Sequence, residues 1–269
     1  MQIAYSRLRT LAAATVAMFA AACGSADRAA KPEGAAPIAL SYHRSVTEDE
    51  FRFDGYQRVV QASAGAYVRV IVRGRGDDGP GSKEMAGGIV NGASGTIIAR
   101  SGLIITAAHI AIDPKLDAEI ITLDGRAHKA RILRVDPARE LAVLQMQPFA
   151  GMQVAELADS ARLAKGDPVF AVGTPGNRPG VVSLGRVVES RRASRLEYNG
   201  YGFDDAIKLK IDVEPGNSGG PVFDRDGRVI GIVASFVLGD VDASKPTPPP
   251  RLAYAVPSNS IRAFLQGQN

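Results

Sequence analysis

The chain has 269 residues, of which 45% are hydrophobic and 22% are charged. These values are typical of a soluble globular protein with a sizeable core, and they argue against intrinsic disorder. The formal net charge is +4, and removal of a leader containing Arg7 and Arg9 would lower it to +2. With so little charge and no basic stripe, we expect no nucleic-acid partner.

The first 22 residues are typical of a bacterial export signal. Arg7 and Arg9 precede an apolar run from Leu11 to Ala22, which is too short to span a bilayer comfortably as a permanent helix. We therefore predict a signal peptide over residues 1–22.

Cys23, the single cysteine of the chain, directly follows Ala20-Ala21-Ala22. This arrangement resembles a lipobox, whose cysteine becomes the lipidated N-terminus, although Ala20 stands where leucine is usual. The alternative is a plain A-x-A cleavage site followed by an incidental cysteine. We predict lipidation at Cys23. Because Gly24 stands where an inner-membrane retention aspartate would stand, we expect a periplasmic protein anchored to the outer membrane of a diderm host.

Residues 24–44 are rich in Ala, Gly, Pro and charge. Residues 23–56 are therefore predicted to be a lipid-anchor cysteine followed by a flexible tether. Ser45 and Glu48 form a candidate capping box for a short helix that ends near Ala62. Three aromatic residues are expected to dock on the folded domain or on a neighbouring subunit, namely Phe51, Phe53 and Tyr56.

Short apolar runs separated by turn residues follow from Tyr67 onward. They predict strands over residues 67–72, 95–99, 103–107, 119–123, 129–135, 141–145, 169–173, 181–190, 206–213, 222–223, 229–236 and 252–256. A helix is predicted near residues 258–266, and the Pro-rich residues 239–251 are predicted to be a surface loop. Many short strands with turns between them indicate an all-β barrel or sandwich.

The stretch from Glu214 to Phe223 reads EPGNSGGPVF and places Ser218 between a Gly-Asn pair and a Gly-Gly pair. Glycines on both sides allow backbone conformations closed to other residues and let a ligand approach closely. The N–H groups of Gly216 and Ser218 are therefore candidates for holding a developing oxyanion. An ordinary Gly-rich turn between two strands would have a similar composition.

Two upstream segments match this serine. One ends in Thr106-Ala107-Ala108-His109, and the other places Glu140 directly before Leu-Ala-Val-Leu. A serine hydroxyl needs a base within hydrogen-bond reach, and imidazole titrates near neutrality. His109 is the best candidate, because His43 lies in the predicted tether and His128 in a predicted edge strand.

TAAH, an acidic residue before LAVL, and GNSGGP, in this chain order, resemble the trypsin-like serine proteases and specifically their HtrA-like bacterial branch. The resemblance spans about residues 57–267. It implies a protease domain over residues 57–269, with two Greek-key six-stranded β-barrels, a C-terminal helix and an active site in the cleft between the barrels. The C-terminal PDZ module of many relatives is expected to be absent.

The resemblance also implies an activity. It indicates a serine endopeptidase that acts on unfolded or damaged polypeptides of the cell envelope. No cofactor or metal is expected, and a homotrimer is permitted. His109 and Glu140 would come from the first barrel and Ser218 from the second.

The acid of this triad departs from the family pattern. Relatives place aspartate before LAVL, whereas this chain has Glu140, which is one methylene longer. Asp136 is the alternative acid, but its place before Pro137 favours a turn-forming role. We predict a triad of Ser218, His109 and Glu140. The departure supports a second hypothesis, a protease-like peptide-binding or chaperone module with impaired turnover.

Two residues bear on the substrate pocket. Asp212 lies six positions before Ser218, the spacing at which trypsin carries the aspartate that binds Arg and Lys side chains. Phe236 falls where the resemblance places an apolar pocket residue. Because Asp212 alternates with Lys208 and Lys210 on a strand face that is expected to be solvated, small aliphatic P1 residues are predicted rather than basic ones.

Overall fold

The computed structural model describes residues 36–43, 55–74, 89–237 and 252–267. The predicted signal peptide, Cys23, the Ser45–Glu48 capping box and the loop over residues 239–251 therefore lie outside the described residues. The same holds for Phe51 and Phe53. Among the helices that the described ranges contain, none has the length and apolar character needed to cross a membrane.

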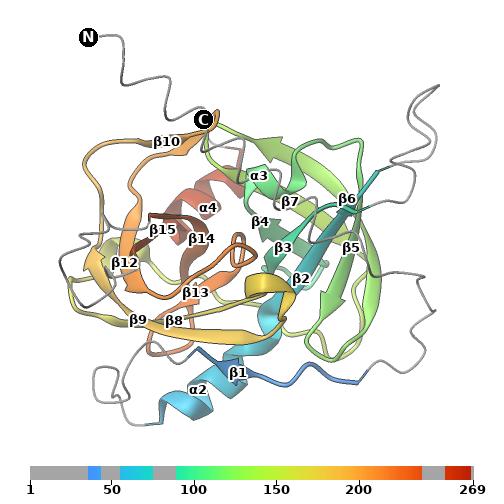
Figure 1. Ribbon diagram of the computed structural model, residues 1–269, viewed down its shortest axis with the longest axis horizontal. Helices are drawn as coiled ribbons and strands as arrows, with labels where there is room; N and C mark the ends of the chain where they lie inside the picture. Colours follow the sequence, from blue (N-terminus) through green and yellow to red (C-terminus); the bar gives the residue numbers. More distant parts are fainter. Residues whose placement is uncertain (1–35, 44–54, 75–88, 238–251, 268–269) are drawn as a thin grey trace, which may run out of the picture. The chain divides into compact units, whose positions relative to one another are not determined.

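Six antiparallel strands form the first barrel, which is green and cyan in Figure 1. They are β2 (Tyr67–Arg73), β3 (Ile89–Ile97), β4 (Leu103–Thr106), β5 (Asp117–Thr122), β6 (Ala127–Asp136) and β7 (Leu141–Met146). Their spatial order is β2-β3-β4-β7-β6-β5, and the pairing of β2 with β5 closes the barrel. Alternate residues such as Val68, Val70 and Val72 are buried in its core, as the period of two in a strand requires.

The second barrel repeats this arrangement. Its strands are β8 (Pro168–Gly173), β9 (Val181–Glu189), β12 (Ile207–Ile211), β13 (Pro221–Phe223), β14 (Val229–Val237) and β15 (Leu252–Pro257). The order β8-β9-β12-β15-β14-β13 is closed by the pairing of β13 with β8. Both barrels therefore place their last three strands in reverse order beside the third, which is Greek-key topology. The predicted pair of six-stranded barrels is confirmed.

Short helices complete the described chain. They are α2 (Tyr56–Ser63), α3 (Ala108–Ala111) and α4 (Ser258–Leu265), with 3-10 turns η2 (Ala64–Ala66), η4 (Ser160–Arg162) and η5 (Pro175–Asn177). Helix α4 is the predicted C-terminal helix. It buries Ile261 and Phe264, and Ser258 Oγ at its start donates to Ala158 O at 2.7 Å.

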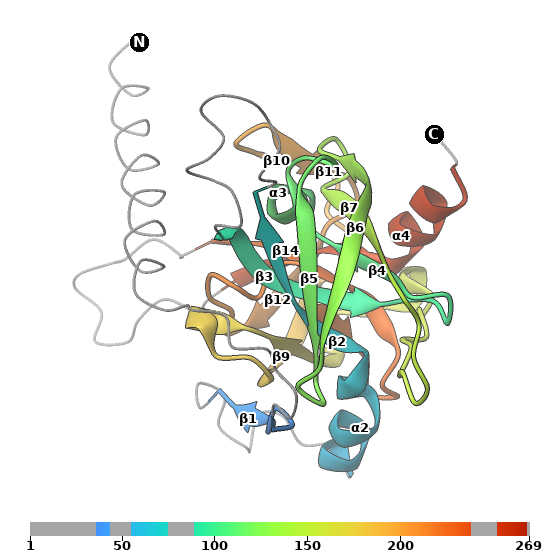
Figure 2. The same cartoon turned by 90° about the vertical axis from the view of Figure 1, so that its right-hand side faces the viewer.

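The end of the predicted tether is part of the folded domain, which corrects the sequence-based expectation. Strand β1 (Ser41–Tyr42) pairs in parallel with Val181 and Val182 at the start of β9. Strand β12 reaches only to Gly185 on that edge of β9, so β1 takes backbone groups that β12 leaves unpaired. Figures 1 and 2 both show β1 at the same end of the molecule as α2.

A further hairpin was not predicted. Strands β10 (Leu196–Tyr198) and β11 (Tyr201–Phe203) pair through an Asn199-Gly200 turn. Both turn residues have positive φ, 48° and 84°, which matches the type I′ turns favoured in two-residue hairpins. In Figure 2 the labels of β10, β11 and α3 lie together at the top.

Candidate active site

Two glycines set the backbone conformation of the loop between β12 and β13, which carries Ser218. Gly216 and Gly219 have φ values of 103° and 80°. A Cβ on Gly216 would lie 2.2 Å from Thr174 O, and a Cβ on Gly219 would lie 2.2 Å from Ser94 O. Both positions therefore require glycine, because the left-handed backbone and the adjacent carbonyls exclude a side chain.

The first barrel holds this loop of the second barrel. Ser94 on β3 uses its N–H to donate to Ser218 O at 3.0 Å and its Oγ to donate to Gly216 O at 2.7 Å. From the other side, Gly219 N–H donates to Val233 O on β14 at 2.7 Å. The candidate nucleophile is thus fixed at the junction of the two barrels.

The amide groups around Ser218 fall into two sets. The N–H of Asn217 donates to Glu214 O at 3.1 Å, and that of Gly219 is also used within the protein. The N–H groups of Gly216 and Ser218 donate to no acceptor among the described residues. These two amides are the predicted oxyanion-hole donors.

His109 lies in α3, directly after β4. Its backbone is held by Asn91, whose Nδ2 donates to His109 O at 3.0 Å. Its Nδ1 hydrogen-bonds to Oε1 of Glu140. The histidine side chain is 25% exposed and that of Glu140 is 0% exposed. The structure therefore joins a solvent-accessible imidazole to a fully buried carboxylate.

Glu140 has an unusual backbone and an unusual carboxylate. Its φ is 54°, a left-handed conformation that costs a non-glycine residue about 1–2 kcal/mol and is often found at functional sites. Oε1 also accepts a hydrogen bond from the Tyr198 hydroxyl at 2.8 Å. Oε2 is buried and has no hydrogen-bond partner within the described chain.

Asp136, the alternative acid, shapes the turn before Glu140. Its Oδ1 accepts from the N–H of Arg139 at 3.2 Å, and its Oδ2 lies 3.5 Å from the Arg139 guanidinium. The structure thus brings Glu140, and not Asp136, to His109.

His109 and Ser218 are not hydrogen-bonded to each other among the contacts of the described residues, although both side chains are described. In substrate-free active sites such bonds are often long, and they tighten when substrate binds.

Two tyrosines of the β10–β11 hairpin flank the imidazole. The rings of Tyr198 and Tyr201 lie edge-on to His109, at centroid distances of 6.2 Å and 5.9 Å. Burial, followed by the negative charge of Glu140, raises the pKa of both hydroxyls above the usual tyrosine value. Both hydroxyls are therefore protonated at neutral pH and can donate. These two tyrosines were not predicted as site residues, although Asn199-Gly200 between them is a strong hairpin signal.

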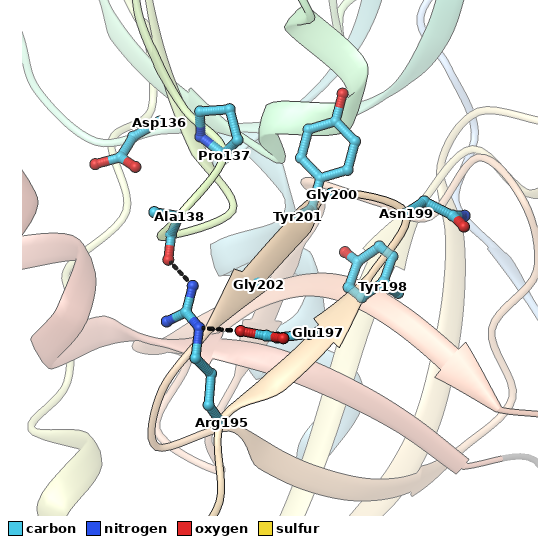
Figure 3. A pocket seen from close by; sticks show the side chains of 10 residues that line it. All are labelled: Asp136, Pro137, Ala138, Arg195, Glu197, Tyr198, Asn199, Gly200, Tyr201 and Gly202. Carbon is cyan, nitrogen blue, oxygen red and sulfur yellow. Dashed lines mark hydrogen bonds and ion pairs between the residues drawn. The ribbon is translucent and has the colours of Figure 1, made fainter.

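The hairpin and the turn before Glu140 together line an open groove of about 680 Å³. Figure 3 shows Arg195 extending across it toward Ala138 and Glu197. The Arg195 guanidinium donates to Ala138 O at 2.6 Å and to Glu197 Oε1 at 2.9 Å. Gly202 N–H donates to Pro137 O at 2.9 Å. The hairpin is thus attached to the turn that positions Glu140.

Asp212 is buried, which corrects the prediction for this residue, whereas Lys210 on the same face is exposed and Lys208 is half-buried. Asp212 is 9% exposed, and its Oδ2 lies 3.0 Å from His43 Nδ1. The other ring nitrogen of His43 lies 3.4 Å from Glu214 Oε1. Strand β1 ends just before His43 and carries it to the loop that precedes Ser218. The side chain of Phe236 lies outside the described residues.

No group of three or more His, Cys, Asp and Glu residues in the described ranges is arranged to hold a metal ion. The absence of a cofactor stays a prediction.

Two Greek-key barrels, with a histidine–carboxylate pair on the first and a Gly-rich serine loop on the second, define the trypsin-like class of proteins. The chain belongs to the trypsin-like peptidase family, because the family model described as "Trypsin-like peptidase domain" matches residues 93–232.

Curated relatives of the chain carry HtrA and DegP names. It is 30% identical over 214 residues to serine protease HTR4 of Bos taurus, covering 80% of this chain and 41% of the relative. It is 34% identical over 176 residues to a probable periplasmic serine endoprotease DegP-like of Bartonella henselae, covering 64% and 32%. It is 32% identical over 176 residues to the mitochondrial serine protease HTRA2 of Drosophila pseudoobscura pseudoobscura, covering 64% and 38%. The chain thus spans well under half the length of these relatives.

Proposed function

We propose that the chain is a serine endopeptidase in which Ser218 is the nucleophile, His109 the general base and Glu140 the triad acid. The observation that carries this proposal is the hydrogen bond from His109 Nδ1 to the buried carboxylate of Glu140. A carboxylate at Nδ1 holds the imidazole in the tautomer whose Nε2 can accept a proton, and it stabilises the imidazolium that forms.

The reaction would proceed through an acyl-enzyme. Ser218 Oγ attacks the carbonyl carbon of the substrate while its proton passes to Nε2 of His109. The N–H groups of Gly216 and Ser218 stabilise the oxyanion, which is commonly the largest single contribution to such catalysis. His109 then protonates the leaving amine. In the second half of the reaction, water gives a proton to His109 and attacks the acyl-enzyme. Ser218 takes that proton back as the carboxylic acid product is released.

Ser218→Ala tests this assignment directly. The substitution removes one hydroxyl and leaves the backbone contacts of the loop intact, so the protein should keep its melting temperature. Hydrolysis of casein should fall to background. Retention of wild-type hydrolysis by Ser218→Ala would show that the protease assignment of this serine is wrong.

The second candidate function is a peptide-binding or chaperone-like module with impaired turnover. The missing hydrogen bond between His109 and Ser218 favours it, together with a glutamate where relatives carry aspartate. This candidate requires the wild-type protein to bind unfolded polypeptides without cleaving them. Prevention of aggregation by both wild type and Ser218→Ala, with no proteolysis by either, would support it.

We further propose that the protease cleaves after small aliphatic residues. A carboxylate selects a cationic P1 side chain when its charge would otherwise be unpaired in the pocket. Here the carboxylate of Asp212 already lies 3.0 Å from the His43 imidazole. Cleavage-site profiling on a denatured protein mixture would contradict this proposal if the cuts fell mainly after Arg and Lys and disappeared in Asp212→Ser.

We also propose an envelope location, with the protease anchored to the outer membrane through lipidated Cys23 and acting on unfolded or damaged proteins. The DegP-like relative named as probable periplasmic supports the compartment. Residues 36–43 belong to the folded domain, which leaves residues 24–35 as the connection. Twelve residues span at most about 43 Å, so the domain would stay close to the bilayer. Recovery of wild type in the soluble periplasmic fraction, like Cys23→Ser, would contradict the anchor. We also propose that the chain forms a homotrimer, which analytical sedimentation would test.

A further inference from the structure

The hydroxyl of Tyr198 donates a hydrogen bond to Glu140, the proposed triad acid. It is 2.8 Å from Glu140 Oε1, the same oxygen that bonds to His109 Nδ1. The residue comes from the β10–β11 hairpin after the second barrel's β9, whereas Glu140 precedes β7 of the first barrel. A side chain from a hairpin between two strands of the second barrel thus reaches the buried acid of the first barrel.

The single proton of this hydroxyl has two acceptors within reach. Ala234 O lies at 3.1 Å and Glu140 Oε1 at 2.8 Å. A carboxylate accepts shorter and stronger hydrogen bonds than a neutral carbonyl does. The Tyr198 hydroxyl therefore donates its hydrogen bond to Glu140. The raised pKa of Tyr198, caused by burial and by the Glu140 charge, keeps the hydroxyl protonated as a donor.

Glu140 needs such a partner more than an aspartate would. Its side chain has one more rotatable bond than aspartate, and its Oε2 finds no partner within the described residues. Without Tyr198, the carboxylate would have one hydrogen bond, to His109, to set its orientation. A second bond to Oε1 restricts the rotation that would carry this oxygen away from the imidazole.

The hairpin that carries Tyr198 is itself fixed to the turn that carries Glu140. Gly202 N–H donates to Pro137 O at 2.9 Å, and Arg195 donates to Ala138 O at 2.6 Å. The distance between Tyr198 and Glu140 therefore depends on contacts a few residues from each of them. This arrangement is typical of a support that orients a catalytic side chain through a second layer of hydrogen bonds.

We propose that Tyr198 is a positioning residue that holds the Glu140 carboxylate against His109 and so compensates for glutamate in place of aspartate. This inference rests on the proposed function, because it assigns the support of the triad acid. It predicts an effect on turnover and not on substrate binding.

The test is Tyr198→Phe, which keeps the ring and removes the hydroxyl. Loss of a hydrogen bond to a charged group should lower kcat about tenfold to a hundredfold, while KM for a peptide substrate stays unchanged. Tyr42→Phe is the control, since it removes a tyrosine hydroxyl from an exposed position on β1, outside the triad and the β10–β11 hairpin. It should keep wild-type kinetics. A change in KM with unchanged kcat in Tyr198→Phe would overturn the inference.

A double-mutant comparison shows whether Tyr198 acts through Glu140. In a Glu140→Gln background, Tyr198→Phe should cause no further loss of kcat. The same fold-loss in both backgrounds would overturn the inference. If Tyr198→Phe does not fold, Arg195→Ala releases the hairpin from Ala138 and should also lower kcat at constant KM, and wild-type kcat in that variant would count against the proposal.

These outcomes separate the inference from the proposed function. Wild-type protein without Ser218-dependent hydrolysis would overturn both. Wild-type activity that depends on Glu140 but is unaffected by Tyr198→Phe would overturn the inference alone.

Discussion

Glu140→Gln is the most informative single substitution in this protein. The glutamine is nearly isosteric, so the fully buried position should keep its packing. What disappears is the negative charge beside His109 Nδ1. If the amide oxygen faces Nδ1, it can still accept from Nδ1–H, but it cannot stabilise the imidazolium. If the amide NH₂ faces Nδ1, it favours the tautomer with the proton on Nε2, which cannot accept the proton of Ser218.

The expected loss of kcat is about 10⁴-fold, as for removal of a triad acid elsewhere. This factor corresponds to about 5.4 kcal/mol of transition-state stabilisation. The melting temperature should be equal to or higher than that of wild type. Glu140 Oε2 has no partner within the described residues, and a buried charge with incomplete hydrogen bonding costs stability.

Steady-state hydrolysis of a fluorogenic peptide measures kcat and KM, and thermal unfolding monitored by circular dichroism reports on folding. Asp136→Asn is the control, because its carboxylate bonds to Arg139 and should matter little for kcat. Wild-type kcat in Glu140→Gln together with a collapse in Asp136→Asn would refute the assignment of the acid. Glu140→Asp should retain or raise activity.

Three further outcomes are expected. Burial raises the pKa of Tyr67 from 10.0 to about 12, so the unfolded chain ionises first as the pH rises from 10 to 12. The contribution of protonated Tyr67 to the free energy of unfolding is fully present below pH 10 and should fall by up to about 2.7 kcal/mol in this window. In urea titrations, the free energy of unfolding of Tyr67→Phe should therefore depend less on pH than that of wild type. Gly219→Ala should abolish activity and folding, whereas Gly151→Ala, with φ of 84° but no atom within 4 Å of the added Cβ, should cost about 1 kcal/mol. His43→Ala should lower the free energy of unfolding by about 1 kcal/mol, measured by urea titration, because Asp212 loses a partner at 3.0 Å.

The barrels could be predicted because the signals are local. Alternating apolar residues and turn residues mark most strands, and the observed bounds differ from the expected ones mainly at the ends. Strand β3 is the largest difference, beginning at Ile89 rather than residue 95. The order of the strands came from the resemblance and not from the pattern.

The contacts that were missed join residues far apart in the sequence. Ser41 pairs with Val181, and a two-residue parallel pairing leaves no pattern in the sequence. Tyr198 meets Glu140 across 58 positions. The alternation along β12 showed which residues share a face, but not that β1 and His43 would cover Asp212.

The motifs were enough to predict that His109 follows a strand of the first barrel and that Ser218 lies in a loop of the second. The preference for Glu140 over Asp136 needed the structure. Both acids precede β7 within one short turn. Their separation depends on the left-handed backbone of Glu140, which turns its side chain into the interior, and on Asp136 bonding to Arg139. Neither feature can be read from the residue types alone.

Labelling with an active-site-directed organophosphonate tests the central claim most directly. Such a probe reacts with a serine hydroxyl that a neighbouring base activates, so it reports on the nucleophile without a natural substrate. Peptide mapping of labelled wild type should place the phosphonate on Ser218, with no label in Ser218→Ala and a greatly reduced rate in His109→Ala. Absence of label on folded wild type, or labelling of Ser218 at an equal rate without His109, would contradict the proposed triad.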